Sequence, residues 1–468
     1  MHYIFQIIKR NRWVFIGLIA GGLLLYMPTP EGLSIMGMRA IVIMVVSIIF
    51  FITEPLPLPG VALLIAVAEV ISGIAGPTET ARSFMSDSVF FIMGSLMIAA
   101  AIIKQKMDKR IALYLLRLTG SGVGRITFGL VAVSALVSSF IGQHAVAAMM
   151  LPVGMTLINL ISEDPSKKMN LSALILLSIA YGALIGSNGT PSSGASNAIM
   201  LNFWNEMFDI KVGYLKWMAY SYPLILFQVP IFAWILLKTF RPEVSEIPRS
   251  VEKLKERIRK EGDMTPNEYW VIGILLFTVI LWVALGDRIG LGITSFIGVS
   301  LYLMTGLVRW EDLNNGINWG IILIYASTIS LGLNIKDTGA GEWMAKSFLE
   351  LISPLGIDSG IPLLAAISIL TIILASVISS GAVVGLLGPI VLNMAQITDK
   401  SILAAGFVTA ISSSFAYMAV AASPACNIVY SSGHLKTSDF LRGGWKMIVV
   451  SILFLLFMVA TYWRLIGI

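Results

Sequence analysis

Residues 140–152 read FIGQHAVAAMMLP and place His144 inside a long apolar stretch, next to Gln143. The chain has three histidines, and the other two, His2 and His434, lie near the ends of hydrophobic segments. An imidazole with an unperturbed pKa of about 6.5 can carry a positive charge near neutral pH. An ionisable side chain within a membrane is costly and usually functional. We therefore interpret His144 as a candidate anion ligand; the alternative is a neutral ring bonded to a backbone carbonyl.

A second stretch matches this one without a gap. GQHAVAAMMLP at 142–152 and SSGAVVGLLGP at 379–389 each begin with a small or polar triplet and continue with Ala-Val, an apolar run and Pro. Each is followed by a further apolar segment and then by a break rich in small residues, IGSNGTPSSGASN at 185–197 and AVAASPACN at 419–427. Hydroxyl and amide groups at such breaks, together with the free backbone amides of half-helices, suit an anion.

The composition places these segments in a lipid bilayer. Of 468 residues, 57% are hydrophobic and 12% are charged, whereas a soluble protein has about 25% charged residues. The net charge of +6 needs no nucleic-acid partner, because basic residues flanking membrane spans account for it. The single Cys426 excludes an intramolecular disulfide and a multi-cysteine metal site. No nucleotide-binding loop, zinc-ligand cluster or catalytic triad stands out, so we expect neither an enzyme nor a cofactor or resident metal.

The predicted fold is an all-α integral membrane protein with about eleven transmembrane helices. A span needs about 20 mostly apolar residues. The predicted spans lie near residues 13–28, 35–53, 58–76, 88–104, 170–187, 216–238, 268–285, 290–307, 318–335, 401–418 and 443–465. Two stretches, 124–161 and 361–398, are too long for one span and are interrupted near the middle. They are predicted to be re-entrant hairpins, whose irregular tips need protein or water around them.

The matched order of hairpin and broken helix predicts an inverted repeat, which places a shared site near the bilayer midplane. The alternative is that small residues merely permit close helix packing. The predicted parts are an N-terminal half, 1–237, with hairpin 124–161 and broken helix 185–207; a charged cytoplasmic linker, 238–267; and a C-terminal half, 268–468, with hairpin 361–398 and broken helix 401–432.

Basic residues predict the orientation in the membrane. Four basic clusters lie near the first span, after the fourth span, in the linker and beside the last span. If the chain crosses the membrane eleven times, all four clusters fall on one side. In chain order they are Lys9, Arg10 and Arg12; Lys104, Lys106, Lys109 and Arg110; Lys253, Lys255, Arg257 and Arg259; and Lys436, Arg442 and Lys446. Because positive loops stay inside, we expect a multi-pass protein of the inner (cytoplasmic) membrane with a cytoplasmic N-terminus.

Four stretches, in this order, resemble the divalent anion/sodium symporter family, the carriers of dicarboxylates, citrate and sulfate. They are FITEPLPLPGVALL (51–64), SVFFIMGSLMIAAAIIKQKMDKRIAL (88–113), IGSNGTPSSGASNAI (185–199) and MAVAASPACNIVYSSGH (418–434). The resemblance runs from about residue 35 to residue 434. It implies two opposed hairpins, a homodimer and an elevator-type movement of a transport domain.

The resemblance also implies a Ser-Asn-Thr triplet at each hairpin tip, which binds substrate carboxylates and, with the broken helices, sodium. This chain departs from that pattern at both tips, with Gly142-Gln143-His144 and Ser379-Ser380-Gly381. At the second break, Ser423 and Pro424 keep the Thr-Pro character, while Cys426 replaces Asn unless Asn427 substitutes for it. The implied substrate ligands are Gln143, His144, Thr190, Ser379, Ser380, Ser423 and Pro424. The implied ion-site residues are Gly142, Ser187, Asn188, Asn197 and Ala422.

These features predict a secondary active transporter of small dicarboxylates such as succinate, malate, fumarate or 2-oxoglutarate. Gly142 and Gly381 lack the side-chain oxygens that a hard cation such as sodium prefers, so anion exchange or proton coupling is favoured over strong sodium coupling. The alternatives are a sodium-coupled di- or tricarboxylate or sulfate symporter that uses backbone carbonyls and, from other classes, an anion channel or a membrane enzyme whose breaks hold a lipid headgroup. The expected partners are dicarboxylate anions, a second copy of the chain and the lipid bilayer, with no nucleic acid.

Overall fold

The computed structural model describes residues 12–105, 120–159, 169–247, 252, 256, 264–420 and 423–468. Within these ranges the regular elements are all helices, without a strand and with one isolated antiparallel bridge, between Gly122 and Glu246. Nine of the described helices are long and apolar enough to cross a membrane, or up to ten if one bent pair is a single span. The predicted all-α membrane class is therefore confirmed.

The N-terminal half contains α2 (Arg12–Tyr26), α3 (Ile35–Thr53), α4 (Leu58–Ser72), α5 (Pro77–Phe84), α6 (Asp87–Lys104), α8 (Val123–Ile141), α9 (Gln143–Asn159), α10 (Met169–Gly186), η2 (Pro191–Ser193), α11 (Ala195–Phe208) and α12 (Tyr214–Thr239). The C-terminal half contains α14 (Pro266–Ile289), α15 (Leu291–Met304), α16 (Trp310–Gly316), α17 (Trp319–Asp337), α18 (Ala340–Ile352), η3 (Ser353–Leu355), α19 (Gly360–Ala375), α20 (Ser380–Ile397), α21 (Ile402–Ser412), α22 (Pro424–Tyr430), α23 (Thr437–Met458) and η4 (Val459–Trp463).

Several predicted spans form shorter helices than expected. The helices α2, α4, α15 and α21 have 15, 15, 14 and 11 residues. At a rise of about 1.5 Å per residue, the longest of these extends only about 22 Å. Conversely, α8 and α20, which are arms of the predicted hairpins, are long enough to count as spans. The helices therefore differ in length from the apolar stretches that predicted them, because Gly, Pro and Ser end several helices inside those stretches.

Both predicted hairpins are interrupted near the expected positions. The first consists of α8 and α9, and Gly142 between them has φ +81°, a conformation that favours glycine. The second consists of α19 and α20, where the hydroxyl of Ser379 accepts a hydrogen bond from the backbone amide of Ala382 at 3.4 Å. This side-chain cap starts α20. A sharp bend of 116° separates α19 from the preceding α18–η3 segment.

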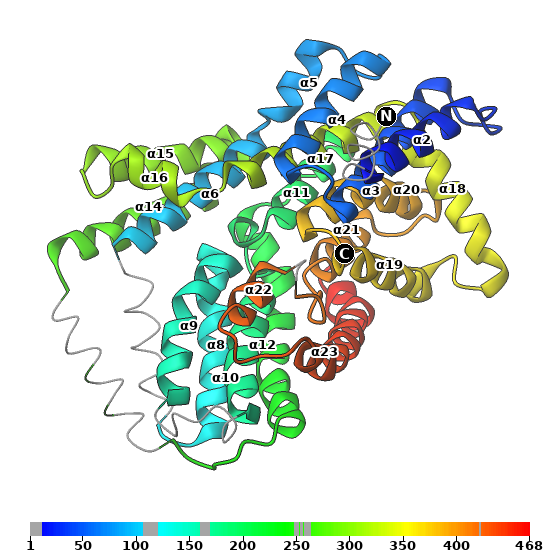
Figure 1. Ribbon diagram of the computed structural model, residues 1–468. Helices are drawn as coiled ribbons and strands as arrows, with labels where there is room; N and C mark the ends of the chain where they lie inside the picture. The colour runs from blue at the N-terminus through cyan, green and yellow to red at the C-terminus, as the bar shows by residue number, and fades with distance from the viewer. Residues whose placement is uncertain are drawn as a thin grey trace, which may run out of the picture.

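The helices of the first hairpin pack around α10, in which every residue from Leu171 to Gly186 is buried. Figure 1 shows α8, α9, α10 and α12 side by side, with α22 beside them, whereas α6, α14, α15 and α16 form a separate group. Close approach depends on small residues, since a Cβ added at Gly186 would overlap the backbone of Ala135 on α8. The first broken helix is thereby fixed against the first hairpin.

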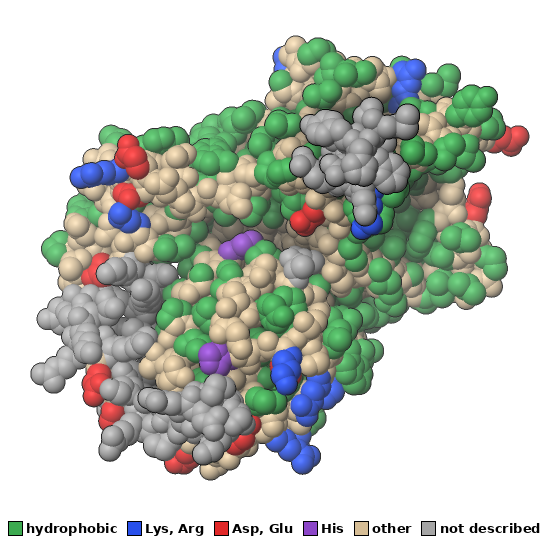
Figure 2. All heavy atoms as spheres, viewed as in Figure 1, with side chains coloured by type: hydrophobic (Ala, Val, Ile, Leu, Met, Phe, Trp, Pro, Cys, Tyr) green, Lys and Arg blue, Asp and Glu red, His purple; other side chains and the backbone are tan. Residues whose placement is uncertain are grey.

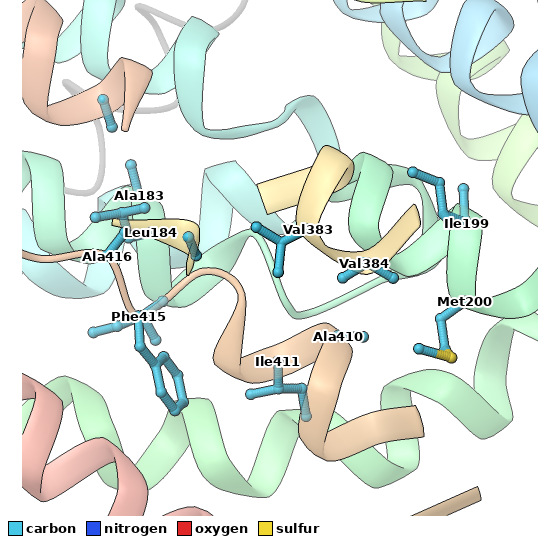
Figure 3. Close-up of a cluster of buried hydrophobic side chains, with 14 of the residues drawn as sticks. Ala183, Leu184, Ile199, Met200, Val383, Val384, Ala410, Ile411, Phe415 and Ala416 are labelled. Atoms are coloured by element: carbon cyan, nitrogen blue, oxygen red, sulfur yellow. The ribbon is translucent and has the colours of Figure 1, made fainter. Parts of the chain in front are cut away.

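The core behind the two breaks joins the two halves of the chain. Figure 3 shows buried side chains from α10 and α11, from α20, and from the end of α21 and the residues after it in one cluster: Ala183, Leu184, Ile199, Met200, Val383, Val384, Ala410, Ile411, Phe415 and Ala416. On α21 itself, the ring of Phe407 packs against Trp204, Trp217 and Trp463 at centroid distances of 4.8, 4.7 and 5.6 Å. Apolar burial of this extent holds the polar breaks at fixed positions.

Candidate functional site

A cavity of about 360 Å³ lies where the first hairpin tip meets the first helix break. The tip contributes Ile141, Gly142, Gln143, His144, Ala145 and Ala148. The break and α11 contribute Ser187, Pro191, Ser192, Ser193, Gly194, Ala195, Ser196 and Ala198. The opposite wall comes from α6 and the start of α17, with Ser380 from the second tip and Ile428 from α22. Segments from both halves of the chain thus surround one cavity.

His144 is open to this cavity and makes no hydrogen bond to any residue in the described part of the chain. In contrast, Nδ1 of His434 lies 2.9 Å from the backbone oxygen of Ser432. Both described histidines are on the face that Figure 2 shows. No Lys, Arg, Asp or Glu is among the described residues that line the cavity. His144 is therefore the side chain there that can supply a positive charge.

Gln143, which precedes His144, also has a side-chain atom without a hydrogen-bond partner in the described part of the chain. Its Oε1 atom is buried and has no hydrogen-bond partner among the described residues. The residue itself lines the cavity beside His144, and its amide includes an Nε2 donor. Two adjacent residues of the first tip can therefore contact one carboxylate.

The first helix break is closed by hydrogen bonds between its own residues. The backbone oxygens of Ser187 and Thr190 accept hydrogen bonds from Nδ2 of Asn197 at 2.9 and 2.8 Å. The hydroxyl of Ser193 lies 2.8 and 2.7 Å from the same two oxygens and has one hydrogen to donate. A sodium ion needs several such oxygens as ligands. Here a donor nitrogen lies between the two carbonyls, and this arrangement leaves them already paired.

Asn188 lies behind the cavity rather than in its wall. Its Oδ1 accepts a hydrogen bond from the hydroxyl of Ser414 at 2.8 Å, which links the first break to the second. Its backbone oxygen accepts from Nε1 of Trp217 at 3.0 Å. Its Nδ2 is buried without a partner among the described residues. Of the five candidate ion-site residues, Gly142 and Ser187 line the cavity, Asn188 and Asn197 lie behind it, and Ala422 is outside the described residues.

The second hairpin tip contributes fewer side chains to the cavity wall than the first. Ser380 lines it, while the hydroxyl of Ser379 caps α20. Gly381 packs against the ring of Tyr325 on α17, and a Cβ added at Gly381 would overlap that ring. Tyr325 itself lines the cavity. The aromatic ring therefore occupies the space that a Thr side chain at position 381 would need.

The remaining candidate substrate ligands do not line the cavity. The hydroxyl of Thr190 donates to the backbone oxygen of Ser139 and lies 3.1 Å from Oγ of Ser192. Ser423 is buried and its hydroxyl accepts from the amide of Cys426 at 3.5 Å, and Pro424 begins α22. Short hydroxyl side chains often bond to the nearby backbone in this way.

Sequence reasoning missed several residues of the wall. Ser192 lines the cavity, with its Oγ 2.9 Å from the hydroxyl of Tyr214. It lies in the break already quoted, so its position was a usable signal. Ser95 on α6, and Asn318 and Tyr325 in and beside α17, also line the cavity. Those segments are apolar on most sides, so their sequence did not indicate which helix face lies against the hairpin. The cavity therefore has a polar side formed by the tip and break and a mainly apolar side formed by α6 and α17.

A family model described as the sodium:sulfate symporter transmembrane region matches residues 9–468. The chain belongs to this family. The resemblance to the divalent anion/sodium symporters that the motifs indicated is thus confirmed. The protein is accordingly a multi-pass integral membrane protein of a transporter family.

Individual relatives are similar over nearly their whole length. The sodium-dependent dicarboxylate transporter SdcS of Staphylococcus saprophyticus is 22% identical over 476 residues, which cover 95% of this chain and 90% of that protein. The sodium-dependent high-affinity dicarboxylate transporter 3 of Caenorhabditis elegans is 27% identical over 463 residues, with coverages of 87% and 80%.

Two solved structures share the fold. MtrF of Neisseria gonorrhoeae, described as illuminating a class of antimetabolite efflux pumps, superimposes with a TM-score of 0.58 at 13% identity and covers 83% of this chain and 84% of its own. The YdaH transporter of Alcanivorax borkumensis gives a TM-score of 0.54 at 11% identity, with coverages of 81% and 86%. At these identities the likeness concerns the fold alone.

Proposed function

We propose that the protein is a secondary active transporter of small dicarboxylates that works by anion exchange or with protons rather than with sodium. The observation that carries the proposal is the position of His144, which faces the cavity unpaired and is the only source of positive charge among the described residues of its wall. A dianion in a site of low dielectric constant needs such a charge and hydrogen-bond donors.

The choice of substrate rests on the relatives and on the size of the cavity. Two relatives are named dicarboxylate transporters, and ligand pockets in proteins range from about 300 to 1,000 Å³. At about 360 Å³ the cavity suits a small anion. We place one carboxylate against Gln143 and His144, and the other toward Ser192 and Ser380 across the cavity.

The first helix break supports operation without sodium. Nδ2 of Asn197 and Oγ of Ser193 already donate to the backbone oxygens of Ser187 and Thr190. Binding of sodium to these oxygens would require both donors to leave, and the loss of hydrogen bonds in a buried loop is costly. The charge balance that sodium provides elsewhere in the family comes, in our proposal, from protonated His144.

Sodium symport is the second candidate, because the relatives named above are described as sodium-dependent. Backbone carbonyls elsewhere in the two breaks would then provide the ligands. This candidate predicts that sodium accelerates uptake, which separates it from our proposal.

The remaining features of the proposal concern assembly and movement. We propose a homodimer in the inner (cytoplasmic) membrane with a cytoplasmic N-terminus, in which hairpins and broken helices form an inverted repeat and move as an elevator-type transport domain. The described basic residues at helix ends, such as Lys104 in the last turn of α6 and Lys238 in the last turn of α12, fit that orientation. Cross-linking in membranes and accessibility labelling of the N-terminus test these two points.

The experiment that tests exchange uses purified protein in proteoliposomes and labelled succinate. Vesicles are loaded with unlabelled succinate, with sulfate, or with buffer alone, and protein-free vesicles serve as the control. We expect rapid uptake into succinate-loaded vesicles, and little uptake into vesicles that contain buffer or sulfate unless a proton gradient is imposed. Strong uptake into buffer-filled vesicles without a proton gradient would contradict the proposal, and rapid uptake of labelled succinate into sulfate-loaded vesicles would show that sulfate is also exchanged.

A further inference from the structure

A second cavity, of about 370 Å³, lies where α10, α12 and α23 come together at one end of the bundle. It is lined by Asn170, Lys238, Thr239, Arg241, Arg442 and Lys446. Four of these six side chains are cationic and none is acidic. Figure 2 shows Lys and Arg side chains gathered at this end of the molecule, where α12 ends beside α10 and α23 in Figure 1. This basic pocket is separate from the candidate transport site.

The four cations have no carboxylate partner among the described residues. The ion pairs in the described part of the chain join residues outside the pocket, for example Lys346 and Glu342 at 2.6 Å. The acid closest in sequence, Glu243, uses its carboxylate to accept hydrogen bonds from the backbone amides of Asn170 and Leu171 at 2.8 and 3.0 Å. That carboxylate is therefore engaged by the start of α10. Four positive charges around one cavity repel one another, so an anion bound there would relieve the repulsion.

The contacts of these cations place the pocket at a membrane surface. Nζ of Lys238 lies 5.9 Å from the ring of Trp234, and Nζ of Lys446 lies 5.9 Å from the ring of Trp445. Both tryptophans are large apolar side chains left open, 60% and 52% exposed. Exposed Trp next to Lys and Arg is typical of the interface between headgroups and acyl chains.

An apolar stripe continues from the pocket along α23. Trp445 is followed on the same helix face by Val449 and Leu453, which are also exposed. Residues four positions apart on a helix lie one above the other, so the stripe runs from the pocket toward the middle of the membrane. Acyl chains of a lipid whose headgroup occupied the basic pocket would lie against this stripe.

We propose that the basic pocket binds a phosphate group, and the exposed Trp445 stripe favours a phosphate carried by an anionic membrane lipid. Guanidinium and ammonium groups donate strong, charge-assisted hydrogen bonds to phosphate oxygens. Basic pockets between membrane helices bind anionic headgroups by this chemistry. The pocket lies on the side that the basic clusters predict to be cytoplasmic, which is the side where anionic lipid attracts such residues.

The test measures lipid binding to the purified, delipidated full-length protein by native mass spectrometry. The probes are dioleoyl phosphatidylglycerol, dioleoyl phosphatidylcholine and inorganic phosphate. A shift in thermal unfolding is recorded with the same three probes. The double variant Arg442→Gln with Lys446→Gln removes two charges from the pocket. Lys336→Gln with Lys346→Gln removes two charges from exposed positions elsewhere and is the matched control.

We expect wild type and the control to bind phosphatidylglycerol more tightly than phosphatidylcholine. Each charge removed from the pocket weakens binding of the anionic lipid about fivefold, so the double variant should bind it about 25-fold less tightly. Phosphate-induced stabilisation that is lost in the double variant would also support the site and assign free phosphate as a source. Equal binding of phosphatidylglycerol to wild type and the double variant, or no preference over phosphatidylcholine together with no effect of phosphate, would overturn the proposal.

Two further double variants separate loss of binding from loss of folding. Arg442→Lys with Lys446→Arg keeps both charges and should retain binding. If the double glutamine variant does not fold, Lys238→Gln with Arg241→Gln removes two exposed charges from the same pocket. Undiminished binding in that variant would equally overturn the proposal.

Discussion

The two hairpin tips occupy matching places in the sequence but present different groups to the cavity they share. At the first tip, Gly142 turns the chain, and both Gln143 and His144 line the cavity. At the second tip, only Ser380 lines it, and Gly381 is packed against Tyr325. The groups for charge and for strong hydrogen bonding therefore come from one half, and the other half contributes a hydroxyl and an aromatic wall.

The two helix breaks differ in a related way. In the first, Asn197 and Ser193 donate to carbonyls of their own loop. Ahead of the second, Ser412 at the end of α21 lies 2.7 Å from the hydroxyl of Ser368, and Ser414 donates to Asn188 at 2.8 Å. The first break therefore has a side-chain amide that donates to carbonyls of its own loop, and no such donor is found among the described residues of the second. Matching sequence patterns in two halves do not imply matching chemistry.

The largest effect is expected from adding a side chain at the second tip. Gly381→Thr introduces the residue that the resemblance implies at this position but places atoms where the ring of Tyr325 lies. Overpacking of a buried position costs about 1–3 kcal/mol, and here the displaced ring also borders the cavity. We expect succinate exchange to fall at least tenfold, with a lower unfolding temperature.

Two variants check the steric explanation of that loss. Combining Gly381→Thr with Tyr325→Ala should recover part of the exchange rate. Gly273→Thr adds the same side chain on α14 where no atom lies within 4 Å, and it should leave the rate unchanged. Normal exchange by Gly381→Thr alone would show that the two tips are not different in the way described.

The next effect concerns the first break. Asn197→Asp replaces the donor between the carbonyls of Ser187 and Thr190 with an acceptor, so three oxygens then face one another. We expect a loss of stability of about 1–3 kcal/mol without sodium, the usual cost of buried groups left unpaired, and recovery when sodium fills the gap. Unfolding temperatures in sodium chloride and in choline chloride measure this. Asn202→Asp, a buried control on the same helix α11, should show no sodium response; a response equal to that of Asn197→Asp would refute the assignment.

A third prediction concerns the charge at the first tip. If protonated His144 binds a carboxylate, substrate binding takes up a proton, and affinity should fall as pH rises through the titration of the bound ring. His144→Gln keeps a donor but not the charge. A hydrogen bond to a charged group contributes about 1.5–3 kcal/mol, so affinity at low pH should fall at least tenfold and its pH dependence should flatten. Succinate binding measured from pH 5 to 8 tests this, with His434→Gln as the control. Parallel curves for wild type and His144→Gln would make the histidine structural.

The smallest effect is expected at an ion pair outside the cavity, which joins the end of α6 to α16. A hydrogen bond from Nζ of Lys104, at the end of α6, and a second from the backbone amide of Arg309 hold the pKa of the exposed Asp312 carboxyl below its usual value. Because the folded-state pKa is lowered, the stabilisation is fully present above the unfolded value of about 3.9. It disappears as pH falls through the folded-state pKa.

Asp312→Asn should therefore lower the unfolding temperature slightly at pH 7, with a smaller difference at pH 3. It should leave the pH dependence of succinate affinity unchanged. A change in that pH dependence would mean that His144 is not the group that titrates.

The fold and the tips were largely predictable because their signals are local. Glycine at 142 and the serines before Gly381 interrupt apolar runs, and they do end or cap helices in the structure. The orientation of the hydroxyls was not predictable, since Thr190 and Ser423 bond to nearby backbone instead of facing the cavity. Tyr325 lies on a helix that is apolar on most faces, so its sequence does not say which face meets the hairpin.

The most direct test of the account compares succinate exchange with and without sodium. Proteoliposomes loaded with succinate receive labelled succinate in sodium chloride or in choline chloride at equal ionic strength and pH. Asn197 donates to both loop carbonyls, and His144, which lines the cavity, supplies the charge in our proposal, so we expect equal initial rates in the two salts. A rate several-fold higher in sodium, or accumulation in empty vesicles driven by a sodium gradient, would contradict it.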